Sequence, residues 1–247
     1  MYRLSNIPGI LARQAARIWP ARCLLCLGDS HSRRICDGCW HDLPHLRHAC
    51  ASCSQPLGAG MAGPCPRCTQ RPPAFARVWT PFVYALPVDA LLRNFKYHQQ
   101  LTAGRLLADL LLMSLPASRP LPEALVPVPL HPARQRERGF NQALELARPL
   151  AQQLPVRLAP ELVRRTRATA EQVSLAAGER RRNLRGAFAS RGTSPSHIAI
   201  IDDVFTTGST AGELARVLRR AGAQRIEVWC VARTVTEPPR AGVQRSR

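Results

Sequence analysis

The sequence contains few acidic residues, few aromatic residues and a single lysine, and it lacks a long apolar run. Asp and Glu number 16 against 35 Lys and Arg, so the formal net charge is +19, which favours a polyanionic partner or an anionic substrate. Aromatic residues make up 5% of the chain, which argues against extensive base stacking. No run of about 18 apolar residues occurs, and this excludes a transmembrane helix.

The two ends of the chain differ from its middle in composition. Residues 1–20 place apolar side chains at roughly helical spacing between arginines, which predicts a short amphipathic helix that packs on the protein or binds a membrane surface or a partner. This segment lacks the apolar core of a secretory signal. Residues 236–247 are polar and basic with two prolines, and we expect this tail to be disordered.

Eight of the nine cysteines form four C-x-x-C pairs. They are Cys23 and Cys26, Cys36 and Cys39, Cys50 and Cys53, and Cys65 and Cys68. Two residues between cysteines let both sulfurs face one ion, and two such pairs supply the four thiolates of a structural zinc site. We therefore predict a double zinc ribbon at residues 21–72 that holds two Zn²⁺ ions with no open coordination position. Sequential pairing closes the shortest loops, while cross-braced pairing and iron–sulfur or redox chemistry stay open as alternatives.

Residues 78–235 have the pattern of an α/β domain. Helical spacing predicts helices at 88–97 and 101–113, and β-branched and aromatic residues predict a strand at 79–84. Further apolar stretches, which alternate with helical segments, are at 124–128, 162–163, 198–201 and 226–231. This alternation predicts an open, mainly parallel sheet with flanking helices and a ligand at its carboxyl edge. Cys230, in the last stretch, fits a buried core position.

The stretch from His197 to Ala211 has the pattern of a phosphate-binding loop. Four apolar residues form a strand that Asp202 and Asp203 close, a turn rich in Thr and Gly follows, and residues 212–221 are helical in pattern. Backbone N–H groups and hydroxyls at such a helix start bind phosphate. The lysine of a Walker A loop is missing. Two carboxylates beside the loop would repel a bare phosphate, so the ligand must also offer them sugar hydroxyls or a Mg²⁺ ion, as a ribose 5-phosphate does. The alternative role of these aspartates, to cap a helix, explains only one of the two.

Residues 198–210 resemble the 5-phosphoribosyl-1-pyrophosphate (PRPP) motif of type I phosphoribosyltransferases. The resemblance implies that Asp202 and Asp203 hold the ribose hydroxyls, that the Thr-rich loop wraps the 5-phosphate, and that Mg²⁺ accompanies PRPP. The motif residues assigned to PRPP binding are Asp202, Asp203, Val204, Phe205, Thr206, Thr207, Gly208, Ser209 and Thr210. The candidate catalytic residues are Asp202, Asp203 and Thr206. Several members have an acidic general base at the position of Thr206, so the threonine supports the ligand site more than nucleobase chemistry.

Basic residues gather in two further segments. Arg134, Arg136 and Arg138 alternate along what we interpret as an exposed loop, and their guanidinium groups suit pyrophosphate oxygens. Lys96 is the one position with a lysine, and its compact ammonium also suits pyrophosphate, although chance retention explains it equally well. The second segment, residues 164–185, holds more arginines than the binding of a single phosphate group needs, so we assign it to a polyanion. The arginines assigned to DNA binding are Arg164, Arg165, Arg167, Arg180, Arg181, Arg182 and Arg185.

These blocks, together with residues 91–97 and the cysteine ribbons, resemble the ComF family of phosphoribosyltransferase-like proteins and its double-zinc-ribbon members. The resemblance covers about residues 20–235. It implies a cytoplasmic role in natural transformation or use of external DNA, binding of single-stranded DNA, and contact with proteins of a DNA-uptake machine. We therefore expect a protein that binds PRPP with Mg²⁺ and single-stranded DNA. An active phosphoribosyltransferase of unknown acceptor is the alternative.

Overall fold

The structure, a computed structural model, describes residues 22–30, 34–58, 60–118, 120–167 and 182–235. The helix expected at 1–20 and the tail expected at 236–247 lie outside these ranges. Contacts within the chain divide it after Pro44 into two compact units. Among the helices in the described ranges, none combines the length and the apolar composition needed to cross a membrane.

The second unit is built on a parallel sheet, which confirms the predicted fold class. Its strands are β1 (Arg77–Trp79), β2 (Phe82–Val83), β3 (Ala124–Pro127), β4 (Arg157–Leu158), β7 (His197–Phe205) and β8 (Arg225–Arg233). They lie in the order β1–β8–β7–β3–β4, β2 also pairs with β8, and each of these pairs is parallel. β7 and β8 are mostly buried because helices cover the central strands of such a sheet on both faces.

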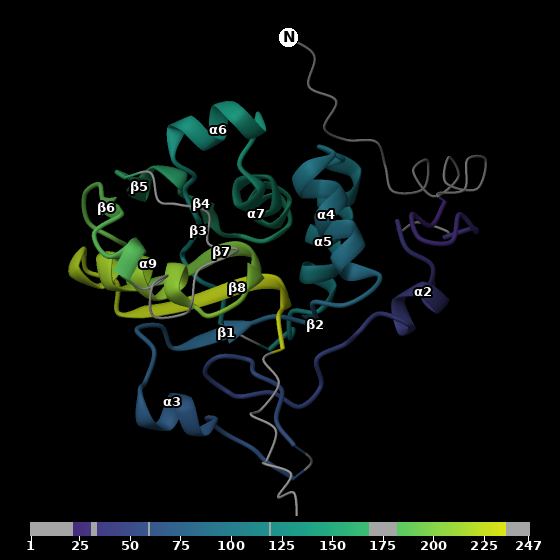
Figure 1. The fold of residues 1–247 in the computed structure, drawn as a ribbon, viewed down its shortest axis with the longest axis horizontal. Coiled ribbons are helices and arrows are strands. Elements are labelled where there is room, and N and C mark those ends of the chain that lie inside the picture. Colours follow the sequence, from purple (N-terminus) through teal and green to yellow (C-terminus); the bar gives the residue numbers. More distant parts are fainter. Residues whose placement is uncertain (1–21, 31–33, 59, 119, 168–181, 236–247) are drawn as a thin grey trace, which may run out of the picture. The chain divides into compact units, whose positions relative to one another are not determined.

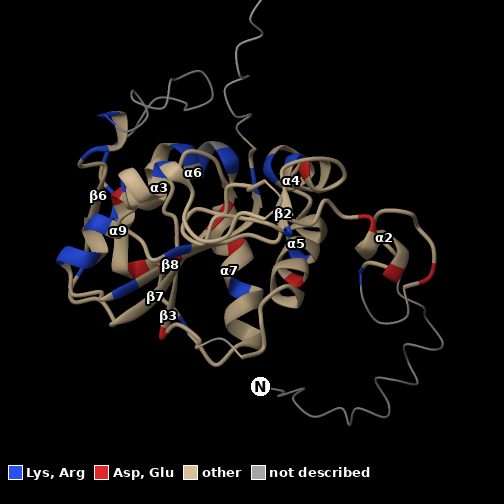
Figure 2. Ribbon diagram, turned by 90° about the horizontal axis from the view of Figure 1, so that it is seen from below, with Lys and Arg blue, Asp and Glu red and all other residues tan. Residues whose placement is uncertain are grey.

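Helices connect the strands and cover the sheet. They are α4 (Val88–Tyr97), α5 (Leu101–Met113), α6 (Pro132–Arg138), α7 (Gln142–Gln153), the 3-10 helix η1 (Pro160–Leu162) and α9 (Ser209–Arg220). The short helix α3 (Pro66–Gln70) precedes the first strand and belongs to the second ribbon. α5 and α7 lie on one face of the sheet and α9 on the other (Figures 1 and 2). The helices that follow the neighbouring strands β3 and β7 therefore leave on opposite faces. This is the topological switch point at which open α/β sheets bind ligands.

The predicted helices at 88–97 and 101–113 are confirmed as α4 and α5. The strand predicted at 79–84 is wrong in its bounds. The chain instead forms β1 and β2, which pair with β8 in the same register on either side of Pro81. Pro81 has no backbone N–H to donate to the sheet, so it interrupts the strand.

Two other expectations about strands differ from the structure. Residues 162–163 do not join the parallel sheet, because β4 already pairs with β3 at that edge. The chain then forms β5 (Val163–Arg165), which pairs antiparallel with β6 (Phe188–Ser190) in a separate small sheet. Asp202 and Asp203 do not close a strand either, since β7 stays paired with β8 as far as Phe205.

The two cysteine ribbons belong to different compact units. The first unit holds α2 (Asp37–His41) and the first four ribbon cysteines. The second ribbon lies in the unit of the sheet, and its cysteines are buried in the same hydrophobic cluster as residues of β7, β8 and α9. Ser54 Oγ donates to the Val78 carbonyl at 2.7 Å, and Val78 N donates to the Ser52 carbonyl at 2.9 Å. These bonds join the second ribbon to β1.

Candidate functional site

The eight ribbon cysteines form two tetrads, each with four sulfur atoms within 4.8 Å of one another. The tetrads are Cys23, Cys26, Cys36 and Cys39, and Cys50, Cys53, Cys65 and Cys68, which confirms sequential pairing. The Cys26 and Cys36 sulfurs are 3.7 Å apart in the first tetrad, and the Cys53 and Cys65 sulfurs are 3.8 Å apart in the second. Tetrahedral Zn²⁺ at about 2.3 Å from each sulfur separates the sulfurs by about 3.8 Å. Both tetrads therefore fit zinc.

Backbone donors support these sulfurs. Cys39 N donates to Cys36 Sγ at 3.4 Å in the first tetrad, and Cys65 N donates to Cys50 Sγ at 3.1 Å in the second. An N–H donor stabilises the thiolate that coordinates a metal. Because each tetrad supplies four cysteine ligands, neither leaves a position for water or substrate, and both are structural centres.

A pocket of about 240 Å³ opens at the carboxyl ends of β3 and β7, the switch point of the sheet. Of the residues assigned to PRPP, it is lined by Lys96, Arg134, Arg138, Asp202, Asp203 and Thr210. Phe205, Thr207, Gly208 and Ser209, which were also assigned to PRPP, line a second pocket instead. α4, α6, β7 and α9 supply these side chains, so the fold brings together groups that are far apart in the sequence. We call this cavity the switch-point pocket.

The C-terminal end of β7 and the turn that follows it are held by local contacts. Asp202 Oδ1 accepts a hydrogen bond from Asp203 N at 2.9 Å, and Asp203 Oδ1 accepts one from Val204 N at 2.6 Å. Gly208 has a φ of +76°, and a Cβ at this position would lie 2.6 Å from the Phe205 ring. Both the backbone angle and the close ring make glycine necessary here.

Helix α9 begins at Ser209, directly after the glycine. The hydroxyl oxygens of Thr207 and Ser209 are 2.9 Å apart, and Ser209 N donates to Thr207 Oγ1 at 3.4 Å. The first N–H groups of a helix have no partner within it, so they can donate to an anion. The side chain of Thr206 is exposed. It ends in a hydroxyl group and therefore lacks the carboxylate with which an acidic residue at this position would accept a proton.

Lys96 and the two aspartates form one charged cluster. Lys96 Nζ lies 2.7 Å from Asp203 Oδ2, and the two side chains are 23% and 12% exposed. Burial opposes the charge on Lys96, but the attraction of Asp203 outweighs it, and the pKa of Lys96 is raised. Burial, followed by repulsion from Asp203, raises the pKa of Asp202 to about 7. Asp202 therefore changes its charge near neutral pH.

The arginines expected on a loop lie instead on helix α6. His131 Nδ1 accepts from Ala133 N at 3.3 Å, Pro132 occupies the first turn, and Gly139 in a left-handed conformation ends the helix. These residues are good helix start and stop signals, which explains the difference. Because of the helix, Arg134 and Arg138 line the switch-point pocket, whereas Arg136 lines a shallower depression elsewhere on α6.

Arg165 lies in the switch-point pocket, although the sequence placed it among the DNA-binding arginines. Burial, followed by repulsion from Arg134, lowers the pKa of Arg165. Its position results from the pairing of β5 with β6, which sequence patterns did not indicate. Tyr97 and Asn141 also line the pocket, and Asn141 accepts from the first N–H groups of α7 while donating to the Val128 carbonyl at 3.1 Å.

Of the other arginines assigned to DNA, the four that the structure describes, Arg164, Arg167, Arg182 and Arg185, do not line the switch-point pocket. Arg167 Nη2 donates to the Asn183 carbonyl at 2.7 Å and the Arg185 carbonyl at 3.2 Å, so it ties two parts of the chain together. Arg164, Arg182 and Arg185 are exposed. Arg180 and Arg181 lie outside the described residues.

Replacing Lys96 with Met removes the cation that faces Asp203 and keeps most of the side-chain volume. We expect the free energy of unfolding to fall by about 2 kcal/mol, because a mostly buried carboxylate loses its partner. Urea unfolding followed by tryptophan fluorescence measures this change. Lys96→Arg keeps the charge and should lose less than half as much. Equal stability of Lys96→Met and the unmodified protein would show that the pair does not stabilise the fold.

Comparison with known proteins adds to this geometry. Residues 15–69 match the family described as the double zinc ribbon domain. The DNA utilization protein YhgH of Escherichia coli K12 is 38% identical over 223 residues, which cover 88% of this chain and 96% of that protein. The protein of the same name from Salmonella typhi is 38% identical over 225 residues, which cover 87% of this chain and 98% of that protein. Competence protein F of Haemophilus influenzae is 34% identical over 223 residues, 86% of this chain and 96% of its own.

Proposed function

The chain belongs to the ComF family, and on this premise we propose that it binds PRPP with Mg²⁺ and handles single-stranded DNA during DNA uptake or utilisation. The names of its relatives, which refer to DNA utilization and competence, support the DNA-related role. Its four-cysteine zinc centres need reduced thiols, which supports a cytoplasmic location.

The observation that carries the ligand proposal is the mixed charge of the switch-point pocket. Asp202 and Asp203 supply acceptors for ribose hydroxyls, and the arginines of α6 and β5 supply donors for phosphate oxygens. A ligand that joins a sugar to phosphates uses both kinds of group. A bare polyphosphate would offer the two carboxylates no hydrogen-bond donor.

Mg²⁺ prefers oxygen ligands, several of them from water and substrate phosphates. Lys96 already lies against Asp203, so in this arrangement the ligand's own oxygens would hold the ion, with Asp202 beside them. Bound Mg²⁺ would neutralise part of the pyrophosphate charge. The protein's own contribution is then to orient the sugar through the aspartates and to stabilise the phosphates through Arg134, Arg138 and Arg165.

Titration of the zinc-loaded protein with PRPP and Mg²⁺ in a calorimeter tests this proposal. We expect micromolar affinity at pH 8 that is about tenfold weaker at pH 6. The raised pKa of Asp202 means that it is protonated at pH 6, so the ligand must first displace a proton to gain the carboxylate. Two buffers with different ionisation enthalpies give the number of protons released.

The variant Asp202→Asn is the matched control for the pH dependence. It cannot release this proton, so any pH dependence that remains belongs to the phosphates of the ligand. A second titration in the presence of a short single strand measures coupling between the two ligands. Absence of PRPP binding at either pH would overturn the ligand proposal. Equal proton release by Asp202→Asn and the unmodified protein would show that Asp202 is not the titrating group.

A further inference from the structure

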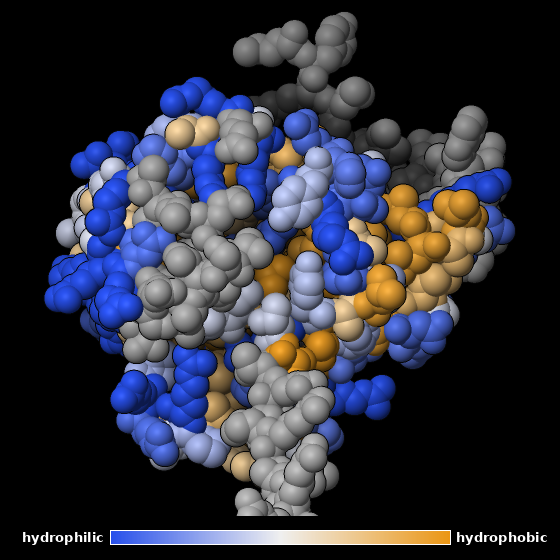
Figure 3. All heavy atoms as spheres, in the orientation of Figure 1, coloured by the Kyte–Doolittle hydropathy of each residue, from blue (hydrophilic) through white to orange (hydrophobic). Residues whose placement is uncertain are grey.

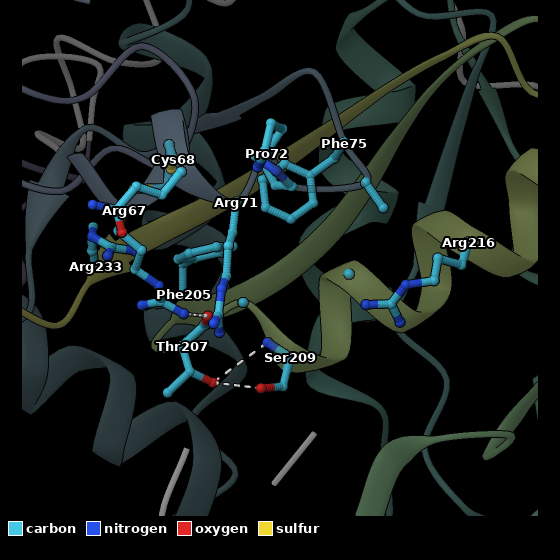
Figure 4. Close-up of a pocket in the computed structure, with 16 residues that line it drawn as sticks. Arg67, Cys68, Arg71, Pro72, Phe75, Phe205, Thr207, Ser209, Arg216 and Arg233 are labelled. Atoms are coloured by element: carbon cyan, nitrogen blue, oxygen red, sulfur yellow. Dashed lines mark hydrogen bonds between the residues drawn. The ribbon is translucent and has the colours of Figure 1, made fainter. Parts of the chain in front are cut away.

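A second and larger pocket, of about 500 Å³, lies between the second zinc ribbon and helix α9. It shares no lining residue with the switch-point pocket, although four residues of the PRPP motif, Phe205, Thr207, Gly208 and Ser209, lie in its wall, and no acidic residue lines it. Its cationic residues are Arg67 and Arg71 of the second ribbon, Arg216 on α9 and Arg233 at the end of β8, and Figure 4 shows them around the turn of Thr207 and Ser209. We call this cavity the four-arginine pocket.

These arginines are only partly neutralised by the protein. Arg233 is 2% exposed and donates from Nε and Nη2 to Gln55 Oε1 at 3.2 and 2.7 Å, while its buried Nη1 has no hydrogen-bond partner among the described residues. Arg67 Nη2 donates to the Thr207 carbonyl at 3.3 Å. Arg71 is exposed and has no acidic partner in the described part of the chain. Arg216 is the one of the four that pairs with a carboxylate, that of Glu213.

The second zinc centre offsets part of the remaining charge. Four thiolates and one Zn²⁺ carry a net charge of about −2, and Cys53 and Cys68 line the pocket. Together with Glu213 this leaves an excess of positive charge, and the exposed arginines Arg67 and Arg71 face no carboxylate among the described residues. Deep blue, hydrophilic side chains gather over α3 and α9, the helices that border the pocket (Figure 3). The pocket is therefore suited to an anion that enters from solvent.

The two aromatic residues of the pocket are not available to stack on bases. Phe75 and Phe205 are 5% and 4% exposed, and their rings meet edge to face with centroids 5.9 Å apart. The guanidinium of Arg233 covers the Phe205 ring at 4.9 Å from its centroid. Recognition must then rest on guanidinium contacts to phosphate, which are independent of base sequence.

We propose that the four-arginine pocket binds the backbone phosphates of single-stranded nucleic acid. This proposal rests on the proposed function, because it assigns the DNA of that function to a place on the chain. A flexible single strand can bend a phosphate into a concave site, whereas a duplex presents its phosphates on a stiff convex surface. The turn of Thr207 to Ser209 lines this pocket while Thr210 lines the other, so strand binding should change the affinity for PRPP.

Fluorescence anisotropy of a labelled 20-nucleotide single strand with the full zinc-loaded protein tests the proposal. We expect Arg71→Glu to weaken binding about tenfold at low salt and to lower the slope of log affinity against log salt by about 1. Arg105→Glu makes the same charge change at an exposed position on α5, outside both pockets, and should stay within about twofold of the unmodified protein.

Three other measurements separate the possible failures. Arg71→Glu should keep its affinity for PRPP within about twofold in the absence of DNA, because Arg71 does not line the switch-point pocket. If the unmodified protein binds no single strand, the proposed DNA-handling function fails and this inference fails with it. If the protein binds the single strand, and if Arg164→Glu lowers this affinity while Arg71→Glu does not, the strand lies on the exposed arginines near β5. Only this inference is then overturned. An equal loss with duplex DNA would overturn the preference for single strands.

Discussion

Replacing both Asp202 and Asp203 with Asn should weaken binding of PRPP with Mg²⁺ by about 100-fold or more. Two carboxylates that accept hydrogen bonds from ribose hydroxyls contribute about 1.5–3 kcal/mol each, and an amide oxygen is a weaker acceptor. The shape of the end of β7 should survive, since the Asn oxygen can still accept from the backbone N–H groups that the Asp oxygens contact. Calorimetric titration measures the loss of affinity.

The same double variant should leave binding of single-stranded DNA nearly unchanged, because neither aspartate lines the four-arginine pocket. The single variant Asp202→Asn is the matched control, since it keeps the contact between Lys96 and Asp203. We expect it to lose about half of the binding free energy that the double variant loses. Loss of both ligands in a double variant that still unfolds cooperatively would show that DNA and PRPP occupy one groove. Retention of PRPP binding would remove the aspartates from the site.

The sequence predicted the elements whose signal is local. The amphipathic pattern of residues 88–97 is strong because the apolar residues recur on one face, and the helix has the predicted bounds. The C-x-x-C spacing also predicted the zinc tetrads and their sequential pairing, because two short knuckles close the smallest loops. Asp202, Asp203 and Thr210 lie at the predicted edge of the sheet because the strand and helix around them are clear from their apolar residues.

The features that the sequence did not predict depend on tertiary contacts. Arg165 enters the switch-point pocket because β5 pairs with a strand that begins more than 20 residues later. The contact of Lys96 with Asp203 joins a helix and a strand that are far apart in the chain, and only the rarity of lysine drew attention to it. The four-arginine pocket is formed by the ribbon, the loop and β8 together, so no single segment has its pattern.

The two zinc centres should differ in what their loss does to the protein. Cys68→Ser removes a ligand from the second tetrad, whose cysteines are buried in the same hydrophobic cluster as residues of the sheet. We therefore expect the midpoint temperature of the main unfolding transition to fall by about 6–12 °C. The substitution should also weaken PRPP binding, because Arg67 of the second ribbon contacts Thr207 of the phosphate loop and Phe75, just after the ribbon, contacts Phe205. Scanning calorimetry and a PRPP titration measure the two effects.

Cys39→Ser in the first tetrad is the matched control, since each substitution removes one thiolate from a four-cysteine site. The first tetrad belongs to a separate compact unit in which Cys26 is exposed, so we expect the main transition and the PRPP affinity to stay unchanged while one Zn²⁺ is lost. A chromogenic chelator counts the ions that each variant retains. If both substitutions lower the main transition equally, the ribbons act as one module. If neither does, the second zinc does not hold the phosphate loop, and Phe205 and Thr207 keep their positions through β7 and α9 alone.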